Sequence, residues 1–211
     1  MFEPLSSASP IRLLQKTLCL LLLATGRRVG EVSHLSRSFL KQRDHLVLSL
    51  LPSFLPKHHT PGFMSSPPCI GFFDKSLLAH PCPARAFLTY IRVSSSWSVV
   101  SSQGHNNLWF LPKSRGPLSV RKVTKLFSSL VEDCRLFYGL SIDLSIGPHQ
   151  MRKLAASYAH LVGQDEDTVK DNMGFSSVST LRKHYVCDVP PLRLPYVLPG
   201  GPFSPEPSSS D

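Results

Sequence analysis

Residues 147–185 read GPHQMRKLAASYAHLVGQDEDTVKDNMGFSSVSTLRKHY, and this stretch decides the interpretation of the whole chain. Pro148 suits the first position of a helix, where its missing N–H would have no partner anyway. Apolar residues then recur at helical spacing, and Gly163 is a typical helix stop. The apolar residues of this predicted helix are Leu154, Ala155, Tyr158, Ala159 and Val162.

The beginning of this helix carries His149 and Arg152, which are three residues apart and therefore project from the same side. Such a helix end can hold an anion, because backbone N–H groups and a guanidinium donate in one direction. Two further short helices are predicted over residues 166–173 and 177–185, and the second would return the Tyr185 hydroxyl to the same place. The plainer alternative is that the helix start is solvated charge and Tyr185 is half-buried packing.

The chain of 211 residues is 42% hydrophobic, which is enough to bury one substantial core, so we expect one domain. The predicted organisation is an N-terminal extension over residues 1–10, the domain over residues 11–189, and a Pro- and Ser-rich tail over residues 190–211. The composition of the tail cannot build a core and predicts disorder.

The net charge of +9 favours a polyanionic partner, of which nucleic acid is the commonest, although many basic proteins bind no specific anion. The five cysteines are odd in number, scattered and without a C-x-x-C pair. They indicate reduced thiols and argue against a disulfide scaffold and a zinc site. No metal and no small-molecule cofactor is therefore expected.

Residues 18–24 resemble the apolar part of a signal peptide, but no small-x-small cleavage site follows them. We interpret them as the end of a buried helix over residues 11–24, which is apolar nearly all round. No stretch reaches the roughly 18 apolar residues of a membrane span. The expected location is the nucleus, or the cytoplasm of a prokaryote, with neither secretion nor membrane insertion.

Thr25 and Gly26 end this helix, and another is predicted from residue 27 to about residue 40. Within it Arg28 and Glu31 are three residues apart, so the carboxylate can orient the guanidinium. A charged pair directly after a buried helix is unusual, and this position favours a functional role for Arg28. The alternative, a surface ion pair that contributes little to stability, stays open.

The remaining segments predict a mainly helical fold with a small sheet. Strands are predicted over residues 46–51, 69–73 and 108–111, and helices over residues 83–90 and from the cap Ser119 to about Tyr138. The apolar stripe of the long helix, from Val123 to Phe137, is expected in the core. Its polar side carries Arg121, Lys122 and Lys125, which suit contact with a DNA backbone. Lys153, in the helix that begins at Pro148, suits the same contact. A solvated helix face explains the same charges equally well.

Together these segments resemble the catalytic domain of tyrosine recombinases, the phage-integrase family, and most of all the recombinases of DIRS-like retrotransposons. ATGRRVGEV (24–32) looks like the first box, which maps the first catalytic arginine to Arg28 and its acid to Glu31. PSFLPK (52–57) resembles the hairpin of the family lysine, here Lys57. HPCPARAFLTYI (80–91) is similar to the segment that follows it in the retrotransposon branch.

GPHQMRKLAASYA (147–159) resembles the second box, with His149 and Arg152, and MGFSSVSTLRKHY (173–185) resembles the third, with Tyr185 as nucleophile. All boxes stand in the family's order. The resemblance implies a mixed, mainly α (α+β) fold with a helical core and a small antiparallel sheet. It also implies double-stranded DNA as partner, a homo-oligomer on DNA, and metal-independent strand transfer through a 3′-phosphotyrosyl intermediate.

Two departures from the family pattern qualify the expected activity. Phe175 stands where the family has His or Trp, and a missing donor of this kind costs about 3 kcal/mol in oxyanion sites. About ten residues precede the first predicted helix, where relatives carry a separate DNA-clamping domain. The alternative function is therefore a catalytically impaired, domesticated or truncated DNA-binding protein that keeps the recombinase fold.

Overall fold

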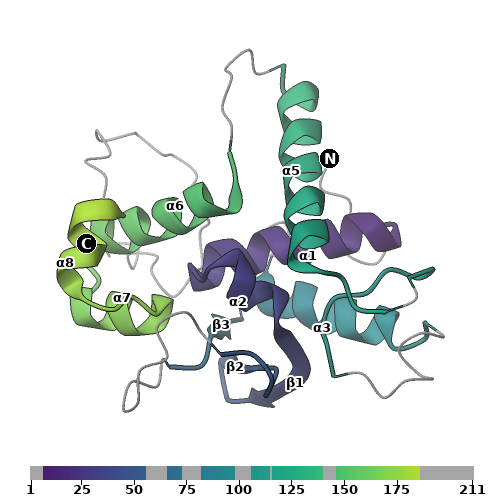
Figure 1. The fold of residues 1–211 in the computed structure, drawn as a ribbon, viewed down its shortest axis with the longest axis horizontal. Helices are drawn as coiled ribbons and strands as arrows, with labels where there is room; N and C mark the ends of the chain where they lie inside the picture. Colours follow the sequence, from purple (N-terminus) through teal and green to yellow (C-terminus); the bar gives the residue numbers. More distant parts are fainter. Residues whose placement is uncertain are drawn as a thin grey trace, which may run out of the picture.

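The computed structural model describes residues 7–55, 66–72, 82–97, 106–114, 116–139 and 146–185. The fold is mainly helical with one small antiparallel sheet, as the sequence predicts (Figure 1). Most of the predicted N-terminal extension and the whole tail lie outside the described residues. The elements are α1 (Pro10–Thr25), α2 (Val29–Ser33), β1 (Leu35–Lys41), β2 (His45–Leu50), β3 (Cys69–Gly71), α3 (Pro83–Ser94), α5 (Val120–Phe137), α6 (Pro148–Leu161), α7 (Glu166–Met173) and α8 (Val178–His184).

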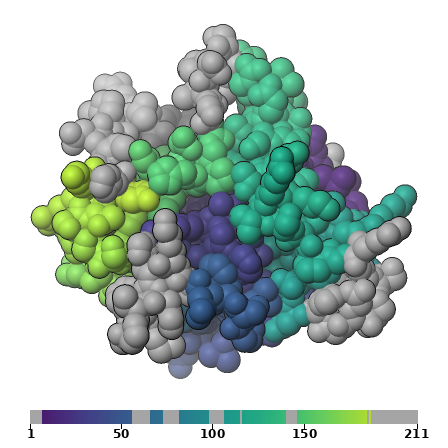
Figure 2. Space-filling model, viewed as in Figure 1, coloured from purple at the N-terminus to yellow at the C-terminus, as the bar shows by residue number. Residues whose placement is uncertain are grey.

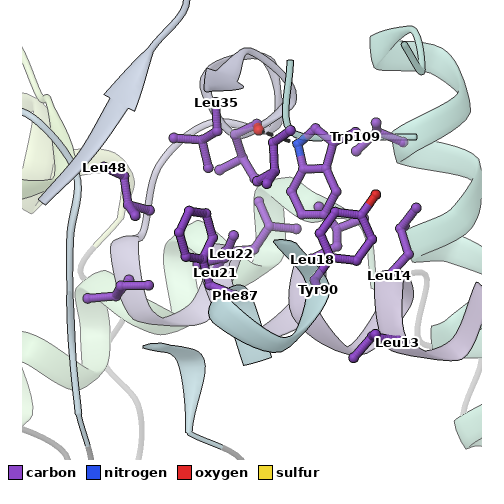
Figure 3. Close-up of a cluster of buried hydrophobic side chains, with 14 of the residues drawn as sticks. Leu13, Leu14, Leu18, Leu21, Leu22, Leu35, Leu48, Phe87, Tyr90 and Trp109 are labelled. Atoms are coloured by element: carbon purple, nitrogen blue, oxygen red, sulfur yellow. Dashed lines mark hydrogen bonds between the residues drawn. The ribbon is translucent and has the colours of Figure 1, made fainter. Parts of the chain in front are cut away.

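Helix α1 forms the centre of the fold and packs against α3, α5 and α6. The Ser9 side chain accepts a hydrogen bond from the Arg12 backbone and so caps its first turn. Leu14, Leu18 and Leu21 are completely buried, as expected for a helix that is apolar nearly all round (Figure 3). Gly26 ends the helix in the left-handed conformation, with φ +57°, and its N–H donates to the Leu22 carbonyl.

Residues 108–111 do not form the predicted strand. Their backbone groups pair elsewhere: the Tyr90 hydroxyl donates to the Phe110 carbonyl at 2.8 Å and accepts from its N–H at 2.9 Å. The Trp109 ring is buried and its Nε1 donates to the Val32 carbonyl (Figure 3). The Leu108 N–H donates to the Leu35 carbonyl of β1 at 2.9 Å, so the segment meets the sheet at one residue, while a tyrosine side chain pairs the backbone of Phe110.

The sheet has the order β1-β2-β3 with antiparallel pairing throughout. The two later strands were predicted correctly to within two residues. The predicted helix from residue 27 to about 40 is wrong, because α2 ends at Ser33 and β1 follows. Leu46 and Leu48 of β2 are buried, and the strand needs a partner along its edge to pair its backbone. That long-range pairing decides the conformation of residues 35–41 over their local preference.

Helix α5 begins at the predicted cap, where the Ser119 side chain accepts from the Lys122 backbone. Only its first half lies in the core, with Val123 and Phe127 fully buried. Its last turn rises away from the body, and Leu136 and Phe137 are exposed (Figure 1). The prediction that the apolar stripe is buried as far as Phe137 is therefore wrong.

Helices α6, α7 and α8 occur where they were predicted and share a small apolar cluster of their own. Of the apolar residues at helical spacing in α6, Leu154 is half exposed, whereas the short Ala155 and Ala159 are buried. The members of the cluster are Ala155, Ala156, Ala159, Val169, Met173, Phe175, Leu181 and Tyr185. The larger cluster around α1 is separate, so contacts between α1 and α6 join the two parts.

Candidate active site

Arg152 is almost completely buried, although its side chain is charged. Its Nη1 donates to the carbonyls of Gly26 and Met173, both at 2.7 Å, so it joins the end of α1 to the end of α7. Its Nε and Nη2 are also buried, yet neither has a hydrogen-bond partner among the described residues. Buried guanidinium nitrogens without acceptors are costly and rare. This edge of Arg152 therefore has capacity for an acceptor that the described residues do not supply.

The pKa of Arg152 shows which charges surround it. Burial lowers this pKa to about 10, and the neighbouring cation Arg28 lowers it as well. Glu31 and Tyr185 act in the opposite direction and stabilise the charged form. Two arginines thus face one another across the site, and an anion between them would relieve their repulsion.

Tyr185 lies directly after α8 and belongs to the small apolar cluster. Its ring centroid is 5.4 Å from that of His149 and 4.5 Å from that of Phe175. The Arg152 Cζ lies 5.3 Å from the centre of the Tyr185 ring. The backbone of Tyr185 is fixed too, because its carbonyl accepts from the Ser157 hydroxyl at 2.9 Å. The returning helix therefore brings the tyrosine to the predicted place.

His149 is exposed at the start of α6, surrounded by cations. Partial burial lowers the pKa of His149 below its ordinary value of 6.5, and Lys153, Arg152 and Arg28 lower it further. The imidazole is therefore mainly neutral at pH 7. A neutral histidine 5.4 Å from a tyrosine ring can take up a proton.

Arg28 reaches the site from the turn before α2. Its Nη1 lies 3.5 Å from the Glu31 carboxylate, so the predicted pairing exists, but it is long. The closer partner of Glu31 is Arg27, with Nη1 and Oε2 3.1 Å apart. Figure 2 shows the surface around α2 flanked by α5 on one side and by α6 and α8 on the other.

Arg27 was missed by sequence reasoning, although it is buried as deeply as Arg152. Its Nη2 donates to the carbonyl of Ser66, before β3, and to that of Asp171 in α7 at 3.4 Å. Burial lowers the pKa of Arg27, while Glu31 raises it. One signal was present in the sequence: Arg27 and Glu31 are four residues apart, a spacing that favours an ion pair.

Two glycine turns fit closely around these arginines. A Cβ at Gly26 would lie 2.7 Å from the Met173 sulfur, and a Cβ at Gly174 would collide with the Arg27 guanidinium. Both glycines have positive φ, +57° and +66°. The turn after α1 and the turn after α7 are therefore packed into one another, which fixes Arg28 relative to the segment that ends at Tyr185.

Other predicted residues lie around this centre or outside the description. Arg121, Lys122 and Lys125 are exposed on the first half of α5, and Lys153 lies beside His149. Lys57 falls outside the described residues, so its placement stays a prediction. Within the described ranges, no three His, Cys, Asp or Glu side chains gather to hold a metal ion, and no helix combines the length and apolarity of a membrane span.

Comparison with known proteins gives matches to solved structures. The XerH site-specific recombinase bound to difH substrate matches with a TM-score of 0.57 and 16% identity over 83% of this chain. The XerA recombinase matches with a TM-score of 0.57 and 16% identity over 90% of this chain. The Tn1549 transposon integrase in complex with circular intermediate DNA matches with a TM-score of 0.57 and 18% identity over 87% of this chain. This chain has the fold of a tyrosine-recombinase catalytic domain.

The tyrosine-recombinase fold is thus shared at low sequence identity. No family model and no curated protein sequence matches the chain. The chain spans 43% of the XerH chain and 62% of the XerA and Tn1549 integrase chains. It therefore corresponds to part of each of these recombinases.

The close fit at Gly174 can be tested with Gly163 as a matched control. Both glycines have positive φ, but a Cβ at Gly163 would meet nothing within 4 Å. We expect Gly163→Ala to lose about 1 kcal/mol of unfolding free energy through backbone strain, and Gly174→Ala about 2 kcal/mol more through the collision with Arg27. Urea unfolding followed by circular dichroism measures both. Equal losses would mean that the Arg27 guanidinium moves aside without cost.

Proposed function

We propose that this chain is the catalytic domain of a DNA strand transferase, which cleaves and rejoins DNA through a 3′-phosphotyrosyl intermediate. The observation that carries the proposal is the buried edge of Arg152, where Nε and Nη2 have no hydrogen-bond partner within the described part of the chain, next to the Tyr185 ring. A phosphodiester presents non-bridging oxygens that suit such donors. The net charge of +9 and the recombinase fold favour DNA as the source of that phosphodiester.

In the proposed reaction the Tyr185 oxygen attacks the phosphorus in line and forms a new P–O bond. A phenol must lose its proton to act as a nucleophile, so a base must accept that proton, and His149 is the neutral group beside Tyr185. The bond from phosphorus to the 5′ oxygen breaks, and Lys57 is assigned to protonate that oxygen. Attack by a 5′-hydroxyl on the phosphotyrosine reverses the steps and needs no ATP.

Arg28 and Arg152 would hold the non-bridging oxygens while negative charge grows on them. Their guanidinium groups would supply the positive charge that metal ions supply in other phosphoryl transfers. The proposal therefore contains no metal and no other cofactor. Glu31 would keep its supporting role, shared between Arg27 and Arg28.

The proposal also covers the exposed cations around the site, the assembly on DNA and the origin of the chain. The exposed Arg121, Lys122 and Lys125, with Lys153, would contact the phosphates of the duplex, and a homo-oligomer would assemble on it. The resemblance of residues 80–91 supports an origin among DIRS-like retrotransposon recombinases and, with it, a nuclear location.

A nicked suicide substrate tests the activity directly, because loss of the short 5′ fragment traps the covalent complex. We expect the unaltered protein to form an adduct that survives denaturing electrophoresis, and Tyr185→Phe to form none. The control is Tyr158→Phe, which removes a half-buried hydroxyl on α6 and should leave the adduct intact. Absence of an adduct with the unaltered protein at every concentration would rule out the proposed chemistry.

The role of His149 predicts a particular pH profile. The base must be neutral, and its pKa lies below 6.5, so the single-turnover rate should be level above pH 6.5 and fall only in more acidic solution. His149→Gln should abolish that acidic limb and slow cleavage at pH 7 by about 100-fold. A rate that still rises steeply between pH 7 and 8 would exclude His149 as the proton acceptor.

A second function, DNA binding without cleavage, is favoured by Phe175, which offers the phosphate no hydrogen bond. Both functions require phosphate contacts, so affinity for a duplex must fall as salt rises. Replacing Arg121, Lys122 and Lys125 together with alanine should lower the salt-dependence slope by about 3. Lys170→Ala is the control, because Lys170 is bound to Asp167 at 2.9 Å. Salt-independent binding would contradict both functions.

A further inference from the structure

Phe175 lies at the centre of the groups that would carry the chemistry. The Arg152 Cζ lies 3.8 Å from the centre of the Phe175 ring, and the Tyr185 ring centroid lies 4.5 Å from it, tilted by 59°. The Phe175 side chain is completely buried. Its backbone is fixed as well, because its N–H donates to the Lys170 carbonyl at 2.8 Å, directly after the Gly174 turn.

The contact with Arg152 restricts the direction of the guanidinium. At 3.8 Å a planar guanidinium packs on the face of the ring, where the π electrons attract its charge. The Nη1 is already held by the carbonyls of Gly26 and Met173. With one nitrogen held and the plane stacked, the edge formed by Nε and Nη2 can point in one direction only.

The contact with Tyr185 restricts the nucleophile from the other side. The Phe175 and Tyr185 rings pack in a tilted arrangement, and the Tyr185 carbonyl is held by Ser157. One aromatic side chain therefore touches both the group that would bind the phosphate and the group that would attack it.

We propose that Phe175 is a positioning residue: its ring fixes the guanidinium plane of Arg152 and the ring of Tyr185 relative to one another, so that both meet the same phosphate. The inference rests on the proposed function of the site. It gives the ring a role that needs no hydrogen-bond donor, unlike the role implied by His or Trp at this position. An aliphatic side chain of similar size cannot perform it.

Substitutions at Phe175 and at Val169 separate positioning from simple packing. Phe175→Leu keeps an apolar side chain but removes the π face, whereas Phe175→His keeps an aromatic ring. Val169→Ala also removes apolar volume from the same buried cluster but leaves the Phe175 ring in place. All three are compared with the unaltered protein in single-turnover cleavage of the nicked substrate at saturating protein, together with duplex affinity.

We expect Phe175→Leu to cleave about thirtyfold more slowly, the rate equivalent of a desolvated cation–π contact, with duplex affinity unchanged within about threefold. Phe175→His should recover at least about tenfold of that loss, and Val169→Ala should cleave at the unaltered rate. The proposal is overturned if Phe175→Leu cleaves at the unaltered rate, or if Val169→Ala slows cleavage as much.

A second measurement decides the matter even if the chain does not cleave DNA. Protons over an aromatic face are shielded, so the Arg152 Hε resonance should be shifted upfield in the NMR spectrum of the unaltered protein. Its assignment comes from its disappearance in Arg152→Lys. The shift should persist in Val169→Ala and disappear in Phe175→Leu. An unshifted Arg152 resonance in the unaltered protein overturns the positioning role, whereas absence of the covalent adduct overturns only the proposed function.

Discussion

Two buried arginines, Arg27 and Arg152, bind carbonyl groups at the end of α7 and so join the two parts of this molecule. Arg152 binds the Met173 carbonyl and Arg27 binds the Asp171 carbonyl, while each also contacts the region around the end of α1. The last carbonyls of a helix lack partners within it and carry a partial negative charge, so cations suit them. The small apolar cluster of α6–α8 is separate from the main core, so these polar contacts, together with the packing of α1 against α6, fix where Tyr185 lies.

This arrangement places strong positive charge in a poorly solvated region. Arg27, Arg28 and Arg152 lie near one buried carboxylate, Glu31, and burial lowers the pKa of both Arg27 and Arg152. Removing one partner of such a pair is costly, because the other charge stays buried. An oxyanion bound at the site would compensate the excess charge, so Arg152 would both stabilise the fold and bind a phosphate.

The sequence predicted those parts of the fold that follow from local pattern. The caps Ser119 and Gly26 mark the ends of α5 and α1, and the predicted α6, α7 and α8 agree with the structure to within a few residues. The sequence-based prediction failed where distant partners decide. Residues 35–41 form a strand because they pair with β2, and the backbone of Phe110, predicted in a strand, pairs with a tyrosine hydroxyl. The burial of Arg27 was not predicted, because arginine is an exposed residue in most proteins. Arg28, His149, Arg152 and Tyr185 lie near one another, while their catalytic roles and the placement of Lys57 stay predictions.

The nearness of Tyr185 to Arg152 and His149 has a consequence for any assembly on DNA. All three side chains belong to one polypeptide and are already in contact without a neighbour, and the tyrosine is tied to its own α6 through Ser157. A protomer would therefore be self-sufficient for the attacking half of strand cleavage. Neighbouring protomers would have to align the two duplexes and time the reaction, but none would need to lend its nucleophile to another.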